Sequence, residues 1–138
     1  MLYLAYGSNL HIGQMSMRCP NADPIRAFDL PDYKLVFRSV ADVEPEVGAS
    51  VPVALWDISE RCEAALDRYE GVANGMYRKE YIKIDEGKAL IYIMNDDGLY
   101  PPGKFYYTTI EEGYQDWELD DEPLRTAHLE SIAESYRT

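Results

Sequence analysis

Residues 6–10, Tyr6-Gly7-Ser8-Asn9-Leu10, join two segments of different periodicity and decide the fold. The apolar residues 1–5 before them predict a short buried strand, and residues 11–18 after them predict a short helix with one apolar face. A small-residue turn between a strand and a helix directs several backbone N–H groups into one space, which suits an anion or a developing oxyanion. Because the turn contains a single glycine, it is neither a P-loop nor a dinucleotide fingerprint, and a carboxylate or an amide is the better ligand hypothesis.

The same turn is also compatible with an ordinary strand–helix junction in which Ser8 or Asn9 caps the helix. The five residues by themselves do not choose between a ligand site and a cap. The choice therefore depends on the rest of the chain.

Composition predicts a single domain over residues 1–138, since 46% of the residues are hydrophobic and the length suffices for a core. The formal net charge of −12 argues against nucleic acid and anionic membranes as partners, and the apolar runs are too short to span a bilayer. Twelve tyrosines are unusual in a chain of this length. We expect most of them at the edge of the core and one or two in a polar pocket.

The two cysteines, Cys19 and Cys62, have neither the spacing of a metal site nor that of a redox motif. We expect both to be reduced and buried as small apolar side chains. Together with the absence of a basic-then-apolar N-terminal segment, this predicts a cytoplasmic protein. His11 and His128 have no ligand spacing, so no metal is expected.

Strands and helices are mixed without a βαβ rhythm, which predicts the α+β class. Residues 42–50 contain Pro45 and Gly48 and are expected to form an exposed loop. The last helix is expected to bury a face made of Leu129, Ile132, Ala133 and Tyr136. The further predicted strands cover residues 26–28, 33–37, 51–56, 77–84 and 88–94, and the further predicted helices cover residues 60–70, 105–113 and 121–136. The strands 77–84 and 88–94 are expected to form a hairpin, with residues 88–94 inside the sheet.

Glu70 is the second informative feature, because it ends the predicted helix 60–70 just before Gly71. The helix dipole places negative potential there, and partial burial adds to its effect, so we expect a raised pKa in the working range of a general base or acid. Position alone favours a solvated surface glutamate. The catalytic interpretation therefore needs support from the other motifs.

That support comes from a resemblance to the γ-glutamylcyclotransferase family. Three segments of this chain resemble motifs of that family and occur in the same order as in the family: Tyr6-Gly7-Ser8-Asn9-Leu10, Leu66-Asp67-Arg68-Tyr69-Glu70-Gly71-Val72, and Gly75-Met76-Tyr77. Pro101-Pro102 with Tyr106, Ile110 and Gly113 is similar to the proline-rich turn and short helix of the family. The resemblance implies a small mixed β-barrel-like sheet with flanking helices.

The resemblance also implies an activity: the α-amino group of a γ-glutamyl amide attacks its own γ-carbonyl, which releases 5-oxoproline and a free amine. It implies a small-molecule γ-glutamyl substrate and no cofactor. Glu70 would act first as the base and then as the acid. The implied substrate-binding residues are Tyr6, Gly7, Ser8, Asn9, Leu10 and Tyr106.

Two alternatives stay open. The enzyme could act on γ-glutamyl amines, including ε-lysyl adducts, or on a γ-glutamyl-protected metabolite. The domain could also bind a small molecule or a partner without turnover, since fold does not determine function, although the presence of Glu70 argues against this. The sequence predicts no particular leaving amine and no oligomeric state.

Overall fold

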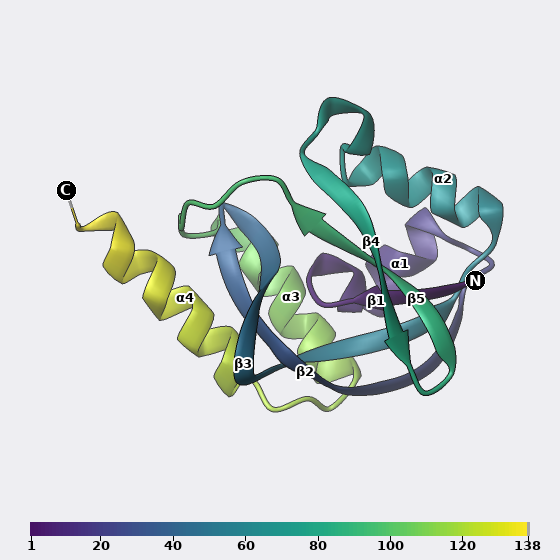
Figure 1. Ribbon diagram of the computed structural model, residues 1–138, viewed down its shortest axis with the longest axis horizontal. Coiled ribbons are helices and arrows are strands. Elements are labelled where there is room, and N and C mark those ends of the chain that lie inside the picture. The colour runs from purple at the N-terminus through teal and green to yellow at the C-terminus, as the bar shows by residue number, and fades with distance from the viewer. Residues whose placement is uncertain (138) are drawn as a thin grey trace.

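Five strands form one mixed sheet in the order β2-β3-β1-β5-β4 in the computed structural model, which describes residues 1–137 (Figure 1). The strands are β1 (Leu2–Ala5), β2 (Asp23–Arg38), β3 (Val40–Asp57), β4 (Tyr77–Ile84) and β5 (Gly87–Met94). The helices are α1 (Ile12–Arg18), α2 (Glu60–Tyr69), α3 (Lys104–Asp116) and α4 (Glu122–Ser135), with short 3-10 helices η1 (Ser8–Leu10) and η2 (Val72–Asn74). The predicted α+β class is confirmed.

The short strand β1 lies in the middle of the sheet. It pairs antiparallel with β3, where Leu4 faces Leu55, and parallel with β5, where Tyr3 faces Leu90. Residues 3–5, whose side chains alternate between the two faces of the sheet, are all buried, which explains why β1 is apolar along its length. The predicted hairpin of β4 and β5 and the inner position of β5 are confirmed, and β2 and β4 form the two edges of the barrel-like sheet.

The helices cover the sheet from different ends (Figure 1). Helices α1 and α2 lie together at the end that holds the N-terminus, whereas α4 lies at the opposite end beside β2. The core reaches from the sheet into α2 through Leu66 and into α3 through Ile110, both fully buried. Within residues 1–137, no helix combines the length and the apolar character needed to cross a membrane.

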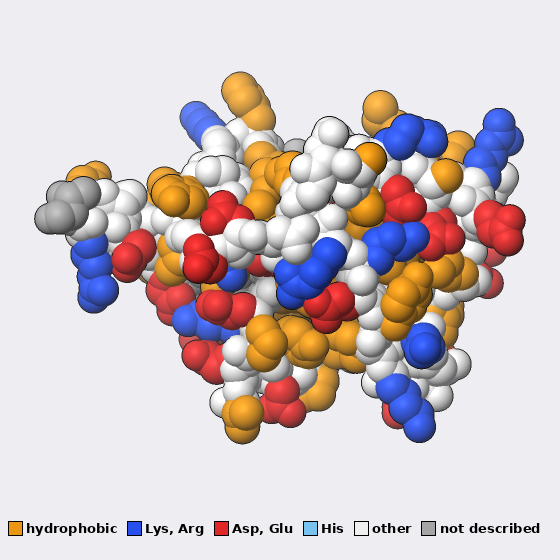
Figure 2. Space-filling view, turned by 45° about the horizontal axis from the view of Figure 1, so that its top comes forward, with side chains coloured by type: hydrophobic (Ala, Val, Ile, Leu, Met, Phe, Trp, Pro, Cys, Tyr) orange, Lys and Arg blue, Asp and Glu red, His pale blue; other side chains and the backbone are white. Residues whose placement is uncertain are grey.

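Charged side chains of both signs are interspersed with apolar ones on the face shown in Figure 2. The acidic residues there are spread over the surface rather than gathered in one patch. This distribution is typical of charge that keeps a protein in solution.

The expected loop at residues 42–50 is wrong, because these residues belong to β3 and pair with β2 in a long hairpin. Pro45 lies opposite Tyr33, and the chain turns at Ser39 instead. Asp42 is buried because it accepts hydrogen bonds from Arg38 and from the Met94 N–H. The two strands expected at residues 26–28 and 33–37 are one strand, β2, with a bulge between them at Asp32, whose φ is 64°.

The expected apolar face of the last helix is also wrong. Helix α4 buries Leu124, Ala127 and Ser131, whereas Leu129 is 65% exposed and Tyr136 is 83% exposed. An ion pair between Lys34 of β2 and Glu130 joins the helix to the sheet. Helix α4 packs through the face that carries Leu124, Ala127 and Ser131, so the side chains of Leu129 and Tyr136 lie away from the sheet.

The two cysteines form a disulfide bond, which corrects the expectation that both are reduced thiols. Cys19 follows α1, Cys62 lies in the first turn of α2, and both are buried. Sequence spacing cannot reveal such a pair, because the cysteines are 43 positions apart and the segment between them includes two long strands that bring the helices together.

Candidate active site

A cavity of about 210 Å³ opens beside the C-terminal end of β1. Its walls come from the loop after β1, the start of β3, the end of α2, and residues of β4, β5 and α3. Glu70 lies in one wall, and Gly7, Ser8 and Asn9 lie in another. The structure therefore brings together the two features that the sequence singled out.

The loop after β1 offers backbone donors to this cavity. Leu10 N donates to Gly7 O at 3.0 Å, and His11 N donates to Ser8 O at 3.1 Å, which forms η1. In the hydrogen bonds of residues 1–137, the N–H groups of Gly7, Ser8 and Asn9 find no protein acceptor. Three free N–H groups in the wall of a cavity can hold a carboxylate or a developing oxyanion.

The side chains of Ser8 and Asn9 bond to neighbouring side chains and do not cap α1. His11 caps α1, because its Nδ1 accepts a hydrogen bond from Gln14 N at 3.1 Å. Asn9 Nδ2 donates to the Tyr3 hydroxyl at 2.9 Å, and Ser8 Oγ lies 2.8 Å from the Tyr69 hydroxyl. The capping hypothesis for Ser8 or Asn9 is therefore wrong.

Leu10 lies apart from the cavity. Its side chain is fully buried, its N–H is used within η1, and its carbonyl accepts from Trp117 Nε1 at 2.9 Å. A Cβ on Gly113 would lie 2.7 Å from Leu10 Cβ, so α3 can approach the loop only with glycine there. Leu10 thus fixes the loop against α3.

Glu70 is placed by the end of α2. Ser59 caps the start of the helix by accepting from Cys62 N, and Gly71, with a φ of 66°, turns the chain away after Glu70. Burial raises the pKa of Glu70 to about 7, against a smaller opposing effect of the nearby Arg18 guanidinium. The hydrogen bonds of the described chain leave the Glu70 carboxylate without a partner, so it is free to exchange a proton with a ligand.

Tyrosines form much of the remaining wall, and two of them are tied to Ala41 at the start of β3. The Tyr77 hydroxyl donates to Ala41 O at 2.5 Å, and the Tyr106 hydroxyl accepts from Ala41 N at 2.9 Å. Burial raises the pKa of both phenols well above the usual range, so both are neutral. Tyr6 also lines the cavity, and its hydroxyl donates to Tyr92 O at 2.6 Å.

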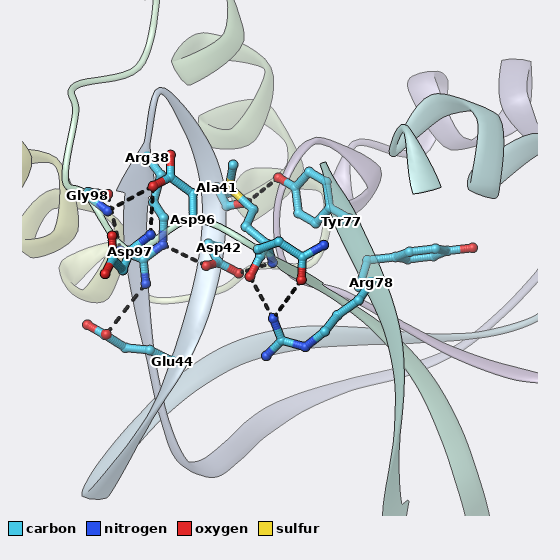
Figure 3. Close-up of polar contacts among 12 residues, drawn as sticks. Arg38, Ala41, Asp42, Glu44, Tyr77, Arg78, Asp96, Asp97 and Gly98 are labelled. Carbon is cyan, nitrogen blue, oxygen red and sulfur yellow. Dashed lines mark hydrogen bonds and ion pairs between the residues drawn. The ribbon is translucent and has the colours of Figure 1, made fainter. Parts of the chain in front are cut away.

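A buried ion pair lies next to Ala41 and holds the start of β3 in place (Figure 3). Arg38 Nε donates to Asp42 Oδ2 at 2.8 Å, and Asp42 Oδ1 accepts from Met94 N of β5 at 2.9 Å. Burial raises the pKa of Asp42, against the lowering effect of these hydrogen bonds. Because Asp42 follows Ala41 directly, the pair fixes the backbone to which Tyr77 and Tyr106 bind.

Sequence reasoning missed several wall residues. It expected one or two tyrosines in a polar pocket, but six line the cavity: Tyr3, Tyr6, Tyr69, Tyr77, Tyr92 and Tyr106. The high tyrosine content was the available signal. Strand pairing, which sequence alone does not fix, decided which ones converge.

This α+β domain gathers a half-buried carboxylate, free backbone donors and neutral phenols around one small cavity. Such a cavity is typical of the active site of an enzyme that acts on a small molecule. Residues 3–119 match the family described as gamma-glutamyl cyclotransferase, AIG2-like, and the chain belongs to this family.

Known proteins of this family are similar to the chain. It is 30% identical to the gamma-glutamylcyclotransferase of Homo sapiens over 76% of its own length and 65% of the human protein. It is 30% identical to the Mus musculus enzyme over 88% of its length and 73% of the mouse protein. A solved gamma-glutamyl cyclotransferase superposes with a TM-score of 0.77 at 26% identity, over 91% of this chain and 85% of that one. The match to the human protein thus spans slightly less than two thirds of its length.

Proposed function

We propose that the protein is a cyclotransferase that converts a γ-glutamyl amide into 5-oxoproline and a free amine. One observation supports this most directly: a carboxyl group with a pKa of about 7 shares a small cavity with three unpaired backbone N–H groups. A cyclisation of this kind needs a proton acceptor and an oxyanion site, and these two roles suit the carboxyl group and the N–H groups. The names of the relatives agree with this activity.

In the proposed reaction, the N–H groups of Gly7, Ser8 and Asn9 bind oxygens of the glutamyl unit, and Tyr6 and Tyr106 limit how it lies in the cavity. The α-amino nitrogen attacks the γ-carbonyl carbon, and Glu70 accepts the proton that this nitrogen loses. The bond to the amine then breaks, and Glu70 returns the proton to the departing nitrogen. Because the nucleophile belongs to the substrate, the protein supplies mainly a folded, near-attack shape, an effect worth roughly 7–11 kcal/mol in favourable cases.

The test is to incubate the protein with γ-glutamyl-L-alanine and to measure 5-oxoproline and alanine by mass spectrometry. We expect Glu70→Gln to lower kcat by about 10²- to 10⁴-fold, the usual contribution of a general acid–base group. Glu60→Gln is the matched control, since Glu60 lies in the same helix but is exposed and outside the cavity.

Equal turnover by wild type and Glu70→Gln would exclude Glu70 as the proton acceptor. Absence of turnover on γ-glutamyl amino acids, γ-glutamyl-ε-lysine and simple γ-glutamyl amines would exclude the proposed activity. The substrate with the highest kcat/KM identifies the class of leaving amine.

A further inference from the structure

We propose that a second cleft, between the C-terminal end of α1 and the start of α2, is a binding site for a small oxyanion. The cleft has a volume of about 170 Å³, and its wall contains three arginines: Arg18, Arg61 and Arg68. Its other wall residues are uncharged and include Asn21, Ser59 and the Cys19–Cys62 disulfide. It shares no wall residue with the cavity that holds Glu70.

The charge balance makes this cluster unusual. The chain has 25 acidic and 13 basic residues, so most arginines find an acidic partner. Within residues 1–137, the arginines in ion pairs are Arg26, Arg38, Arg78, Arg125 and Arg137. The three remaining arginines of the chain all lie in the wall of this cleft, and no Asp or Glu lines it. Such an arrangement leaves room for an anion that comes from outside the protein.

The walls of the cleft are fixed in place. The disulfide links the residue after α1 to the first turn of α2. Arg18 Nη1 donates to Asn9 Oδ1 and Nη2 donates to Gln14 Oε1, each at 2.8 Å, while its guanidinium lies 3.6 Å from the centre of the Tyr69 ring. These contacts hold the Arg18 guanidinium beside Asn9 and Tyr69, where it also lowers the pKa of Glu70. Arg61 and Arg68 are therefore the arginines that the cleft offers to a ligand.

Helix α2 adds to the positive potential. Ser59, its N-cap residue, lies in the wall, so the positive end of the helix dipole is near the cleft. The acidic residues of the first turn, Glu60 and Glu63, lie outside the wall, and Glu63 pairs with Lys79. Arginine binds carboxylate and phosphate through parallel N–H groups, which makes both groups suitable ligands.

The experiment titrates the full-length, disulfide-bonded protein with inorganic phosphate, and separately with acetate, by calorimetry and by amide chemical shifts. We expect saturable binding, with shifts centred on Cys19, Asn21 and Ser59. The double variant Arg61→Gln/Arg68→Gln should raise the Kd at least tenfold, since each hydrogen bond to a charged group is worth about a factor of ten.

The matched control is Lys83→Gln/Lys88→Gln, which removes the same charge from two exposed lysines outside the cleft. It should leave the Kd within about twofold, as expected for exposed charges far from the ligand. Stronger binding of phosphate than of acetate identifies a phosphate-type ligand, and the reverse order identifies a carboxylate.

Absence of saturable binding of both anions, or an equal loss in both double variants, would overturn the proposal. The readout is binding rather than turnover, so its failure is distinguishable from failure of the proposed enzymatic activity.

Discussion

Ser8 and Tyr69 lie within hydrogen-bond distance, with 2.8 Å between Ser8 Oγ and the Tyr69 hydroxyl. This contact joins the loop after β1 to the last residue of α2, immediately before Glu70. The residues are 61 positions apart, so the contact exists only in the folded chain. It sets the spacing between the backbone donors and the proposed proton acceptor.

The Ser8–Tyr69 contact predicts an energetic coupling. We expect Ser8→Ala and Tyr69→Phe each to destabilise the fold by about 1 kcal/mol, and the double variant to cost no more than either single one. Urea unfolding of the four proteins measures the coupling. Strictly additive effects would show that the two hydroxyls do not interact.

The raised pKa of Glu70 predicts how activity depends on pH. In the proposed reaction the ionised form of Glu70 is the base, so kcat/KM for γ-glutamyl-L-alanine should fall about tenfold per pH unit below about pH 7. A pH–rate profile between pH 5 and pH 9 measures this limb. A limb near pH 4.5 would show that the Glu70 carboxyl is as hydrated as an ordinary surface glutamate.

Glu70 also affects stability. The Glu70 carboxyl loses its proton near pH 4.5 in the unfolded chain and near pH 7 in the folded chain. Between these pH values the folded state binds more protons than the unfolded state, so the folded state loses stability as the pH rises from about 4.5 to about 7. Glu70→Gln removes this loss. We expect its Tm to exceed that of the wild type by about 10 °C at pH 8 and to match it at pH 4. Equal melting temperatures at pH 8 would contradict the effect of burial.

Gly113 predicts a packing defect. In Gly113→Ala the new Cβ would meet Leu10 Cβ at 2.7 Å and His11 N at 2.8 Å, so helix α3 or the loop must shift. We expect a loss of about 1–3 kcal/mol in stability and a raised KM. Gly103→Ala meets nothing within 4 Å and serves as the control; because Gly103 is the N-cap of α3, we expect it to cost no more than about 1 kcal/mol. Equal effects at both glycines would show that α3 tolerates the added methyl.

The Arg38–Asp42 pair predicts a large cost for removing one partner. Asp42→Asn leaves the buried Arg38 with only the more distant carboxylate of Glu44, 3.5 Å away, and we expect a loss of about 3–5 kcal/mol in urea unfolding. The exposed pair of Arg125 and Asp121 provides the comparison, since Asp121→Asn should cost less than about 1 kcal/mol. A small effect of Asp42→Asn would indicate that water reaches Arg38.

The disulfide predicts sensitivity to reduction. It closes a loop of 43 residues, so a dithiol reductant should lower the stability by roughly 2–4 kcal/mol. The double variant Cys19→Ser/Cys62→Ser should unfold identically with and without the reductant. An unchanged wild-type transition in the presence of reductant would contradict the bond.

Local patterns predicted much of the fold and two parts of the candidate site. The 3.6-residue period and the caps around Glu60–Tyr69 gave helix α2, and the turn at Asp85-Glu86-Gly87 gave the β4–β5 hairpin. The same reasoning failed at residues 42–50, because proline and glycine favour loops locally while the partner strand β2 stabilises an extended chain. It also failed for α4, whose buried face depends on where β2 lies.

The sequence by itself determined the α+β class, the donor-rich loop after β1 and a glutamate at the end of a helix, because turns, caps and periodicity act over a few residues. Only the tertiary structure decided that Glu70 is half-buried, that six tyrosines line the same cavity, that Cys19 bonds to Cys62 and that three arginines share one cleft. Burial and long-range contacts depend on which segments pack together, and that choice follows from the energy of the whole core rather than from any single stretch.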